Sequence, residues 1–426
     1  MDLNELILRT YPWWEMQRVR ELSLGSRRPD RRLSNEWRHT PALLDHDYRG
    51  ITTPNCDTLY SGAWLDLADG PVLIEIPISD LPYWSIAVMD MNTDNIAIMG
   101  SRYPGSRSLL VCGPDYRGAI PVGMPHVRSA SKIVWLLARY LIGNDALVAQ
   151  AEAMRRDVRL ARPLGGANSV AACPLRVPLV AAVRKDPANF WQVIRSTLDE
   201  DNTIAGPADS PFYLEIQNTW PPGVTEWNDL DASLRQRFVD AFNHVLQRVT
   251  ANNSGNMQTR NHWRYPGKDI GNFGGNQLYR AEVSLWGLGA LPASEVIYVA
   301  AIADAQGVQL NGVNNYRFRI PPEGIPAEAF WSLTLYEVDP HGGMYFTANV
   351  PKRYAVGNRT QGLHKNLDGS IDIWISHTQP VEVDRQANWL PAPAGVFRLL
   401  IRAYAPSESF QSGQVLPPAI ERCANT

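Results

Sequence analysis

The chain reads Tyr-Trp-Ser-Ile-Ala-Val-Met-Asp at residues 83–90 and Phe-Trp-Ser-Leu-Thr-Leu-Tyr-Glu at residues 330–337. The two stretches match without a gap in their aromatic, Trp, Ser, apolar and acidic positions. Each lies among residue types that favour strands, and polar turn residues follow each within about a dozen positions. This internal echo predicts two related β-sandwich halves in one chain.

The sequence around each stretch supports the same interpretation. Short β-prone runs punctuated by Gly and Pro fill residues 50–123, and strands return from Val296 to the end of the chain, closing with residues 397–404. Apolar residues at helical spacing predict an amphipathic helix at Leu3 to Ser23 that covers a sheet. The same spacing predicts further helices at residues 133–137, 147–154, 190–194, 234–246 and 281–288. Residues 251–275 are rich in Asn and Gly and are expected to form a loop, with a binding-site lid as one interpretation.

The length of 426 residues suits two or three domains. We expect an N-terminal helix, a first sandwich and two helices in 1–165, a helical bridge with the Asn/Gly-rich loop in 166–290, and a second sandwich in 291–426. The chain should therefore be mainly β with inserted helices, as two β-sandwich domains joined by a helical region.

Composition excludes several classes of protein. The 40 basic and 43 acidic residues are interspersed and the net charge is -3, so nucleic acid is not an expected partner. Apolar runs are too short to cross a membrane, and charged residues interrupt the first 22 positions where a signal peptide would be apolar. The cysteines, Cys56, Cys112, Cys173 and Cys423, show no metal or disulfide spacing. We expect reduced thiols and a cytoplasmic location.

Several motifs resemble a two-module bacterial family. Thr53 to Ser61, Tyr83-Trp84-Ser85 with Asp90 and Asn92, and Gly113-Pro114 resemble domain of unknown function 1254. The motifs that resemble its companion, domain of unknown function 1214, come later: Tyr279-Arg280-Ala281, residues 287–290, residues 330–336, Asn349, Arg353-Tyr354, residues 368–370 and residues 388–393. The resemblance covers nearly the whole chain and implies paired jelly-roll-like sandwiches. Cys56 stands where the family pattern has Asn, and the family's frequent leader is absent, which suggests a specialised cytoplasmic branch.

The segment from Asn55 to Tyr60 is the candidate for chemistry. Asn55, Asp57, Thr58 and Tyr60 can all hydrogen-bond or transfer protons, and burial could bring the pKa of Asp57 towards neutrality. Asp57, Tyr60 and Asn55 are therefore the catalytic candidates. The same residues also make good turns, because Asn and Asp bond their own backbone, and that structural alternative stays open.

Other side chains are candidates for binding substrate. They are Thr58, Trp84, Asn92, Tyr336, Arg353 and Trp389. Arg353 could hold a carboxylate and the tryptophans could stack on a ligand, although buried Trp more often fills a core. No nucleotide-binding motif and no metal-ligand spacing is present, so no cofactor is expected; a metal stays an unsupported alternative, with His262 and His377 the first to test.

Two functions remain. The first is a cofactor-independent hydrolase, lyase or cyclase that acts on a small organic molecule by acid–base chemistry in a cleft between the sandwiches. The second is a non-catalytic carbohydrate- or lipid-binding protein in which Trp84, Trp331 and Trp389 stack on the ligand. The expected partner is a small-molecule substrate, and neither nucleic acid nor a membrane is an expected partner. The sequence does not decide whether the chain forms a homo-oligomer.

Overall fold

The computed structural model of this chain describes residues 2–423 except 26–32, 104, 106, 144, 166–167, 169, 172–183, 252–254 and 341. Cys173 lies outside the described residues, as do Asn252 and Asn253 of the Asn/Gly-rich segment. The described helices are α1 (Leu3–Leu24), α2 (Asp145–Asp157), α3 (Pro187–Glu200), α4 (Pro211–Thr219), α5 (Ala232–Ala251), α6 (Gln277–Trp286), α7 (Val383–Ala387) and α8 (Glu408–Gln411). The prediction of a mainly β chain with inserted helices is confirmed.

The N-terminal strands form two facing sheets. The larger has the order β2-β3-β9-β5-β6 and the smaller β10-β4-β7-β8, while β1 pairs with β11 separately. Their bounds are β1 (Leu33–Ser34), β2 (Arg38–His39), β3 (Thr58–Asp66), β4 (Val72–Glu75), β5 (Trp84–Asp90), β6 (Asn95–Gly100), β7 (Ser108–Cys112), β8 (His126–Arg128), β9 (Ile133–Leu141), β10 (Arg159–Ala161) and β11 (Val170–Ala171). Apolar side chains of both sheets, including Leu65, Ile74 and Val111, share one core.

The C-terminal strands repeat this arrangement. The larger sheet has the order β12-β13-β14-β21-β16-β17, with β18 also pairing β16, and the smaller sheet has the order β20-β19-β15-β22. Their bounds are β12 (Gln258–Arg260), β13 (Trp263–Tyr265), β14 (Val296–Ala301), β15 (Asn315–Ile320), β16 (Ala327–Val338), β17 (Met344–Tyr345), β18 (Ala355–Gly357), β19 (Ile371–Ser376), β20 (Trp389–Pro391), β21 (Phe397–Pro406) and β22 (Glu421–Cys423). A second core, with Phe318, Leu333 and Ile373, lies between them.

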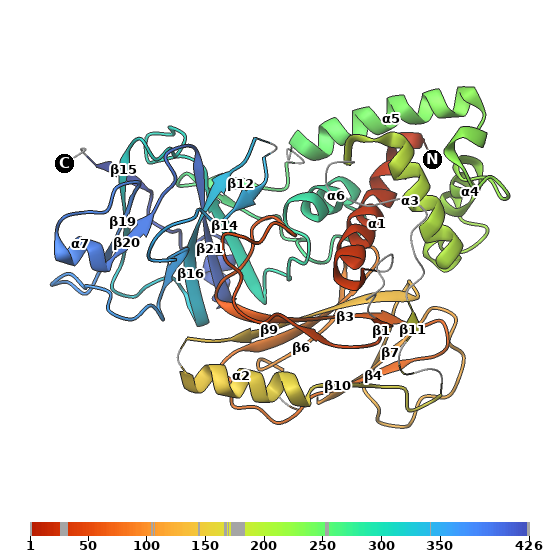
Figure 1. Cartoon of the computed structure of the whole chain (residues 1–426), viewed down its shortest axis with the longest axis horizontal. Coiled ribbons are helices and arrows are strands. Elements are labelled where there is room, and N and C mark those ends of the chain that lie inside the picture. Colours follow the sequence, from red (N-terminus) through yellow and green to blue (C-terminus); the bar gives the residue numbers. More distant parts are fainter. Residues whose placement is uncertain are drawn as a thin grey trace.

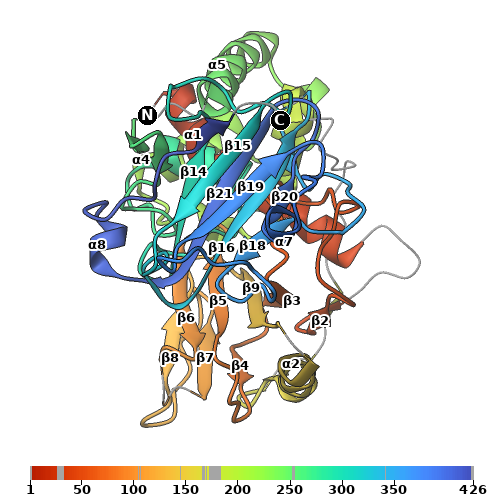
Figure 2. The same ribbon diagram turned by 90° about the vertical axis from the view of Figure 1, so that its left-hand side faces the viewer.

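The large helices gather in one block that adjoins both pairs of sheets. Figure 1 shows α1, α3, α4, α5 and α6 together, with the N-terminal strands below and the C-terminal strands at the other end of the molecule. Figure 2, turned by 90°, shows β14, β21 and β16 above the N-terminal strands β5 and β9. A third apolar core joins helices to both modules, and it includes Trp14, Trp135, Leu288 and Phe330.

The two echoed stretches occupy corresponding strands, β5 and β16. Alternation along a strand points neighbouring side chains to opposite faces. Trp84 therefore packs into the N-terminal core and Trp331 into the C-terminal core. The preceding aromatic residues, Tyr83 and Phe330, face the other way and meet each other with ring centroids 5.6 Å apart. Each echoed stretch thus supplies one aromatic residue to its own core and one to the contact between modules.

The predicted helix at residues 133–137 is wrong. Ile133–Leu141 forms β9, the central strand of the five-stranded sheet, and the helix follows only at α2. Almost every residue of β9 is buried, because cores lie on both of its faces. A continuous apolar run of this kind has no period that separates a strand from a buried helix.

Two other expectations need correction. α1 has no single apolar face; it packs among α3, α5 and α6 as well as against the five-stranded sheet, and its charged residues Glu15, Arg18 and Arg20 are buried. Glu15 accepts from Arg18 at 2.8 Å, which compensates the burial of both charges. Part of the expected loop at 251–275 forms β12 and β13, because Trp263 packs into the C-terminal core.

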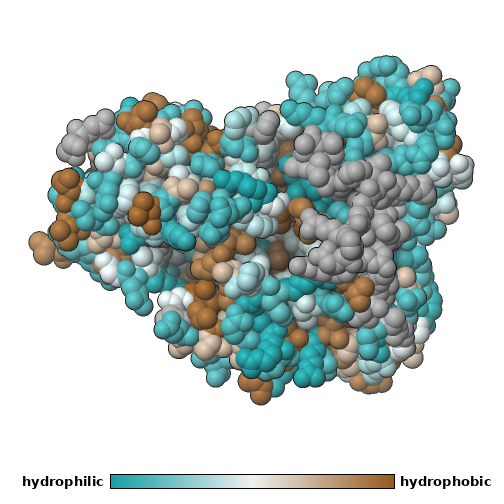
Figure 3. Space-filling model, in the orientation of Figure 1, coloured by the Kyte–Doolittle hydropathy of each residue, from teal (hydrophilic) through white to brown (hydrophobic). Residues whose placement is uncertain are grey.

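The visible surface and the described cysteines give little information about the function of the protein. Figure 3 shows apolar residues in small groups separated by hydrophilic ones on the visible face. Cys56, Cys112 and Cys423, the cysteines that the structure describes, are free thiols. None of the helices described here combines the length and apolar character that crossing a membrane requires.

Candidate functional site

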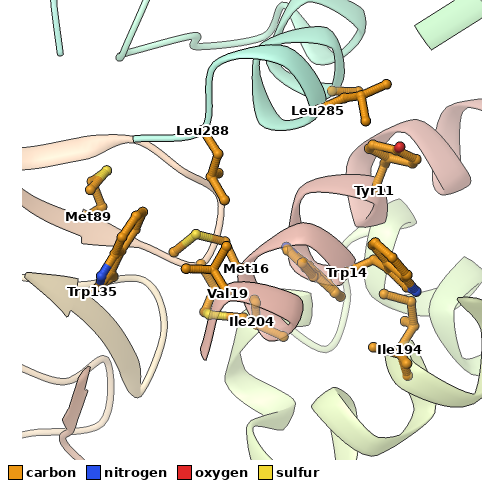
Figure 4. Packing of buried hydrophobic residues seen from close by; sticks show 14 of the residues in the cluster. Tyr11, Trp14, Met16, Val19, Met89, Trp135, Ile194, Ile204, Leu285 and Leu288 are labelled. Atoms are coloured by element: carbon orange, nitrogen blue, oxygen red, sulfur yellow. The ribbon is translucent and has the colours of Figure 1, made fainter. Parts of the chain in front are cut away.

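A cavity of about 520 Å³ lies where the two large sheets and the helices meet. We call it the inter-module cavity. Side chains from β3 and β9 form one wall, those from β14 and β21 the opposite wall, and α6 with part of α1 closes a side. Figure 4 shows how Val19 of α1 packs close to Trp135 of β9 and to Leu288, which follows α6; all three line the cavity. Cavities of this size and position commonly hold small molecules.

The wall from the N-terminal module follows directly from strand pairing. β3 and β9 are antiparallel, with Tyr60 opposite Arg139, Gly62 opposite Leu137 and Trp64 opposite Trp135. Because side chains alternate along a strand, these three pairs share one face. That face is the cavity wall.

Arg139 is the most unusual group on this wall. Its side chain is buried, its Nη2 donates to the carbonyl oxygen of Gly289 at 2.7 Å, and its guanidinium lies 5.6 Å from the centre of the Tyr60 ring. Its Nη1 is buried and has no hydrogen-bond partner within the described chain. A buried charged donor without an acceptor costs free energy, so an acceptor from a ligand would be favourable here.

Tyrosine side chains surround this guanidinium. Tyr60, Tyr298 and Tyr404 line the cavity. Burial raises the pKa of Tyr404 well above its ordinary value, and the neighbouring Tyr60 and Tyr298 add to the effect. Burial also raises the pKa of Tyr298. These two phenols therefore stay protonated at neutral pH and can donate hydrogen bonds.

The segment Thr53 to Asn55 fastens the two modules together beside the cavity. Arg402 of β21 donates to the carbonyl oxygen of Thr53 at 2.8 Å, and Tyr336 of β16 donates to that of Pro54 at 2.6 Å. Asn55 donates through Nδ2 to the Tyr404 hydroxyl at 2.8 Å. This segment of the N-terminal module is thus held by the C-terminal sheet.

Asn55 also makes the turn that the sequence suggested. Its Oδ1 accepts from the backbone N–H of Asp57 at 2.7 Å, and its Nδ2 donates to the Thr58 hydroxyl at 3.1 Å. Both ends of the amide are engaged, so Asn55 holds its neighbours in position. Asn55 therefore both forms a turn, as the structural alternative expected, and lines the inter-module cavity.

The three catalytic candidates do not share one cavity. Asn55 and Tyr60 line the inter-module cavity, whereas Asp57 lines a second cavity of about 640 Å³. There the Asp57 carboxylate accepts from Ser332 of β16 at 2.6 Å. Burial raises the pKa of Asp57, and the Ser332 hydrogen bond and the charges of Arg402 and Arg359 oppose that rise.

The candidates for substrate binding divide in the same way. Tyr336 lines the inter-module cavity, and Arg353 lines the second cavity but donates to the carbonyl oxygens of Ala387 and Trp389 at 2.9 and 3.0 Å. Thr58 is fully buried, and Asn92 accepts from Trp13 at 2.8 Å. These contacts hold the fold together.

The tryptophans chosen for stacking are interior residues. Trp84 and Trp331 belong to the cores of their modules, although Trp331 also borders the second cavity. Trp389 is 9% exposed and donates to the carbonyl oxygen of Ser376 at 3.1 Å. A different set, Trp64, Trp135 and Trp286, lines the inter-module cavity.

Arg139 is the site residue that the sequence reasoning missed. In the sequence, Arg139 is the one charge within the otherwise apolar run of residues 133–142. A charged residue inside a strand that is buried on both faces needs a partner or a function, and that signal was available. Tyr298 and Tyr404 carried no comparable signal, because tyrosines are common in strands.

No group of three or more His, Cys, Asp or Glu side chains suited to a metal ion occurs among the residues that the structure describes. His262 and His377, the first metal candidates, therefore belong to no such group. The Nδ1 of His377 lies 3.0 Å from the carbonyl oxygen of Ala392.

Comparison with known proteins identifies two modules. Residues 34–162 match the family described as "Protein of unknown function (DUF1254)", and residues 295–408 match DUF1214 under the same description. The solved VPA0106 protein of Vibrio parahaemolyticus is similar over 99% of both chains, with a TM-score of 0.68 and 22% identity. A putative uncharacterized protein of Burkholderia cenocepacia aligns over 99% of this chain and 92% of its own, with a TM-score of 0.46 and 13% identity. No curated protein matches.

Proposed function

The chain belongs to the family that joins a DUF1254 module to a DUF1214 module, and we propose that it is an enzyme that transfers protons on a small organic molecule in the inter-module cavity. The observation that carries the proposal is the cross-strand pair of Tyr60 and Arg139 on the cavity wall, with one guanidinium nitrogen unpartnered in the described chain. A proton-transfer group thus lies beside a fixed positive charge.

Each of these side chains has a chemical role in the proposal. Tyr60 exchanges a proton with the substrate, as a positioned phenol can. Arg139 stabilises negative charge on the substrate, and a fixed charge in a site that excludes water does so without reorganising in the reaction. Asn55 is a positioning residue, because it holds the Tyr404 hydroxyl. Asp57 opens on the second cavity and takes no part.

We also propose the fold of each module, the cell compartment and the class of reaction. Each module is a jelly-roll-like β-sandwich, which the two facing sheets around one core in each module support. The protein acts in the cytoplasm on a small-molecule substrate, without a nucleotide cofactor and without nucleic acid or membrane partners. Hydrolase, lyase and cyclase reactions all suit the proposed acid–base chemistry.

The experiment separates binding from turnover. A panel of organic acids, ketones, alcohols and sugars is added to the full-length protein, and binding is followed by tryptophan fluorescence because three tryptophans line the cavity. Conversion of each binding compound is measured by proton NMR. We expect Tyr60→Phe to bind with unchanged affinity and to convert the compound at least about 100-fold more slowly, which is the lower range for losing an acid–base group.

Two substitutions of Gly62 test whether the ligand binds in the inter-module cavity. A Cβ at this position would meet its nearest atoms at 3.8 Å, so Gly62→Ala should behave as wild type. Gly62→Phe places a ring in the cavity and should abolish binding. Bound compounds that are recovered unchanged would make the chain a binding protein instead. Binding and conversion that survive Gly62→Phe, or a panel with no binding class, would reject the inter-module cavity.

A further inference from the structure

Two buried hydrogen-bond donors on the same cavity wall have no partner within the described chain. They are Nη1 of Arg139 and Nε1 of Trp64, and both side chains are at least nine-tenths buried. Buried N–H groups in native proteins are almost always paired, with protein, water or ligand. Both side chains line one cavity, so a bound ligand with two acceptors would supply the missing partners.

Strand geometry gives the separation of the two residues along the backbone. Trp64 is opposite Trp135, and Arg139 lies four residues further along β9 on the same face. At about 3.3 Å per residue the two positions are about 13 Å apart. Between them lie Gly62, which has no side chain, and its cross-strand partner Leu137. The wall is therefore apolar at its middle and has a donor side chain near each end.

The remaining lining defines the chemistry between the ends. Trp64 and Trp135 stack with centroids 5.5 Å apart and planes 7° apart, and Leu137 and Trp286 add apolar surface. Flat aromatic faces and an apolar wall favour a ligand with an apolar body. The ligand therefore needs polar groups mainly at its two ends.

The charge of the lining favours an anion. Five arginines and one glutamate line the cavity among the described residues: Arg38, Arg139, Arg264, Arg398, Arg402 and Glu282. Burial and the nearby charge of Arg264 lower the pKa of Arg398, which reflects positive charges gathered at one site. A guanidinium with a free N–H is a good carboxylate donor.

We infer that the substrate is an elongated apolar carboxylate, whose carboxylate accepts from Arg139 and whose second acceptor, towards the other end of the wall, accepts from Trp64. This inference rests on the proposed function and names the substrate class of the same cavity. It concerns recognition only and requires no particular reaction.

The test uses probes that differ in one feature each. Hexanoate, decanoate and tetradecanoate vary the length, decanol removes the charge, and the ketone-ended analogue of decanoate adds the second acceptor. Affinity is measured by isothermal titration calorimetry with the full-length protein. We expect decanoate to bind more tightly than hexanoate and at least about tenfold more tightly than decanol, and the ketone to improve decanoate further.

Two variants test which residue binds each end of the ligand. Arg139→Met keeps an unbranched side chain, removes the charge and should remove the preference for decanoate over decanol. Trp64→Phe keeps a ring and removes the N–H, so it should abolish only the gain from the ketone. Near-UV circular dichroism checks that both variants fold. If Arg139→Met does not fold, the ketone measurement on Trp64→Phe still tests the inference.

The outcomes distinguish the inference from the proposed function. Equal affinity for decanoate and decanol, or a ketone gain that survives Trp64→Phe, would overturn the substrate class. If carboxylates bind as expected but are never converted, the substrate class stands as a ligand class and the enzymatic proposal fails. Conversion of neutral compounds alone would support the enzyme and overturn the inference.

Discussion

Asp90 offers a sharp test of how burial tunes this fold. It ends β5, is 4% exposed, and its Oδ1 accepts from the backbone N–H groups of Asn92 and Asp94 at 2.9 and 3.1 Å. Burial, with the charge of Asp94 as the next cause, raises the pKa of Asp90 from 3.8 to about 7. The backbone hydrogen bonds and Arg280 only partly oppose the rise.

The direction of the pH effect follows from proton binding. Between about pH 4 and pH 7 the folded chain holds a proton on Asp90 that the unfolded chain has released. The contribution of Asp90 to stability is therefore complete below about pH 4, falls as the pH rises to about 7 and is lost above it. One pH unit between two pKa values corresponds to about 1.4 kcal/mol, so the loss amounts to about 4 kcal/mol.

Asp90→Asn isolates this contribution, because the amide keeps the Oδ1 acceptor and cannot ionise. We expect the variant to match wild type near about pH 4 and to exceed it by up to about 4 kcal/mol near about pH 8. The measurement is the urea midpoint of the same unfolding transition, followed by near-UV circular dichroism across this range. Asp94→Asn should shift the wild-type slope to lower pH. A difference between Asp90→Asn and wild type that is constant with pH, or larger in acid, would refute the reasoning.

Two further predictions concern the module contact and strand packing. Tyr83→Phe removes a hydrogen bond of 2.8 Å to the fully buried carboxylate of Glu295 and should lower the free energy of unfolding in urea by about 2 kcal/mol. Tyr103→Phe removes a bond of 3.2 Å from a partly exposed side chain to the same carboxylate and should lower it by less than about 1 kcal/mol; equal losses would contradict this account. Gly357→Ala places a Cβ in collision with the carbonyl oxygen of Trp331 in β16 and should lower the melting temperature by several degrees. Gly275→Ala, with no atom within 4 Å, should leave the melting temperature unchanged. An unaffected Gly357→Ala would show that β18 can move.

Much of the strand arrangement could be predicted from the sequence. The echo at residues 83–90 and 330–337 located a strand of each large sheet, and the Trp of each lies in the core of its module as alternation requires. β9 could not be predicted in this way, since burial on both faces removes the periodicity that distinguishes a strand from a helix.

The candidate site was predicted only in part. Asn55 and Tyr60 do line a cavity, but Asp57 lies on another one, although it is only three residues from Tyr60. Sequence distance carries no information about which cavity a side chain enters once a turn intervenes. The Asn55 turn bends the chain there, and the Ser332 hydrogen bond draws Asp57 to the C-terminal sheet.

The sequence alone determined the two modules, the echoed strand of each and the aromatic residues that fill their cores, because these depend on local alternation and on burying apolar surface. Only the tertiary structure decided that Arg139 would face Tyr60, that Trp64 would share its wall, and that the C-terminal tyrosines would complete the cavity. Those neighbours come from strand register and from the docking of two sheets far apart in the chain. Register and docking are set by the sum of many contacts, which no single stretch of sequence contains.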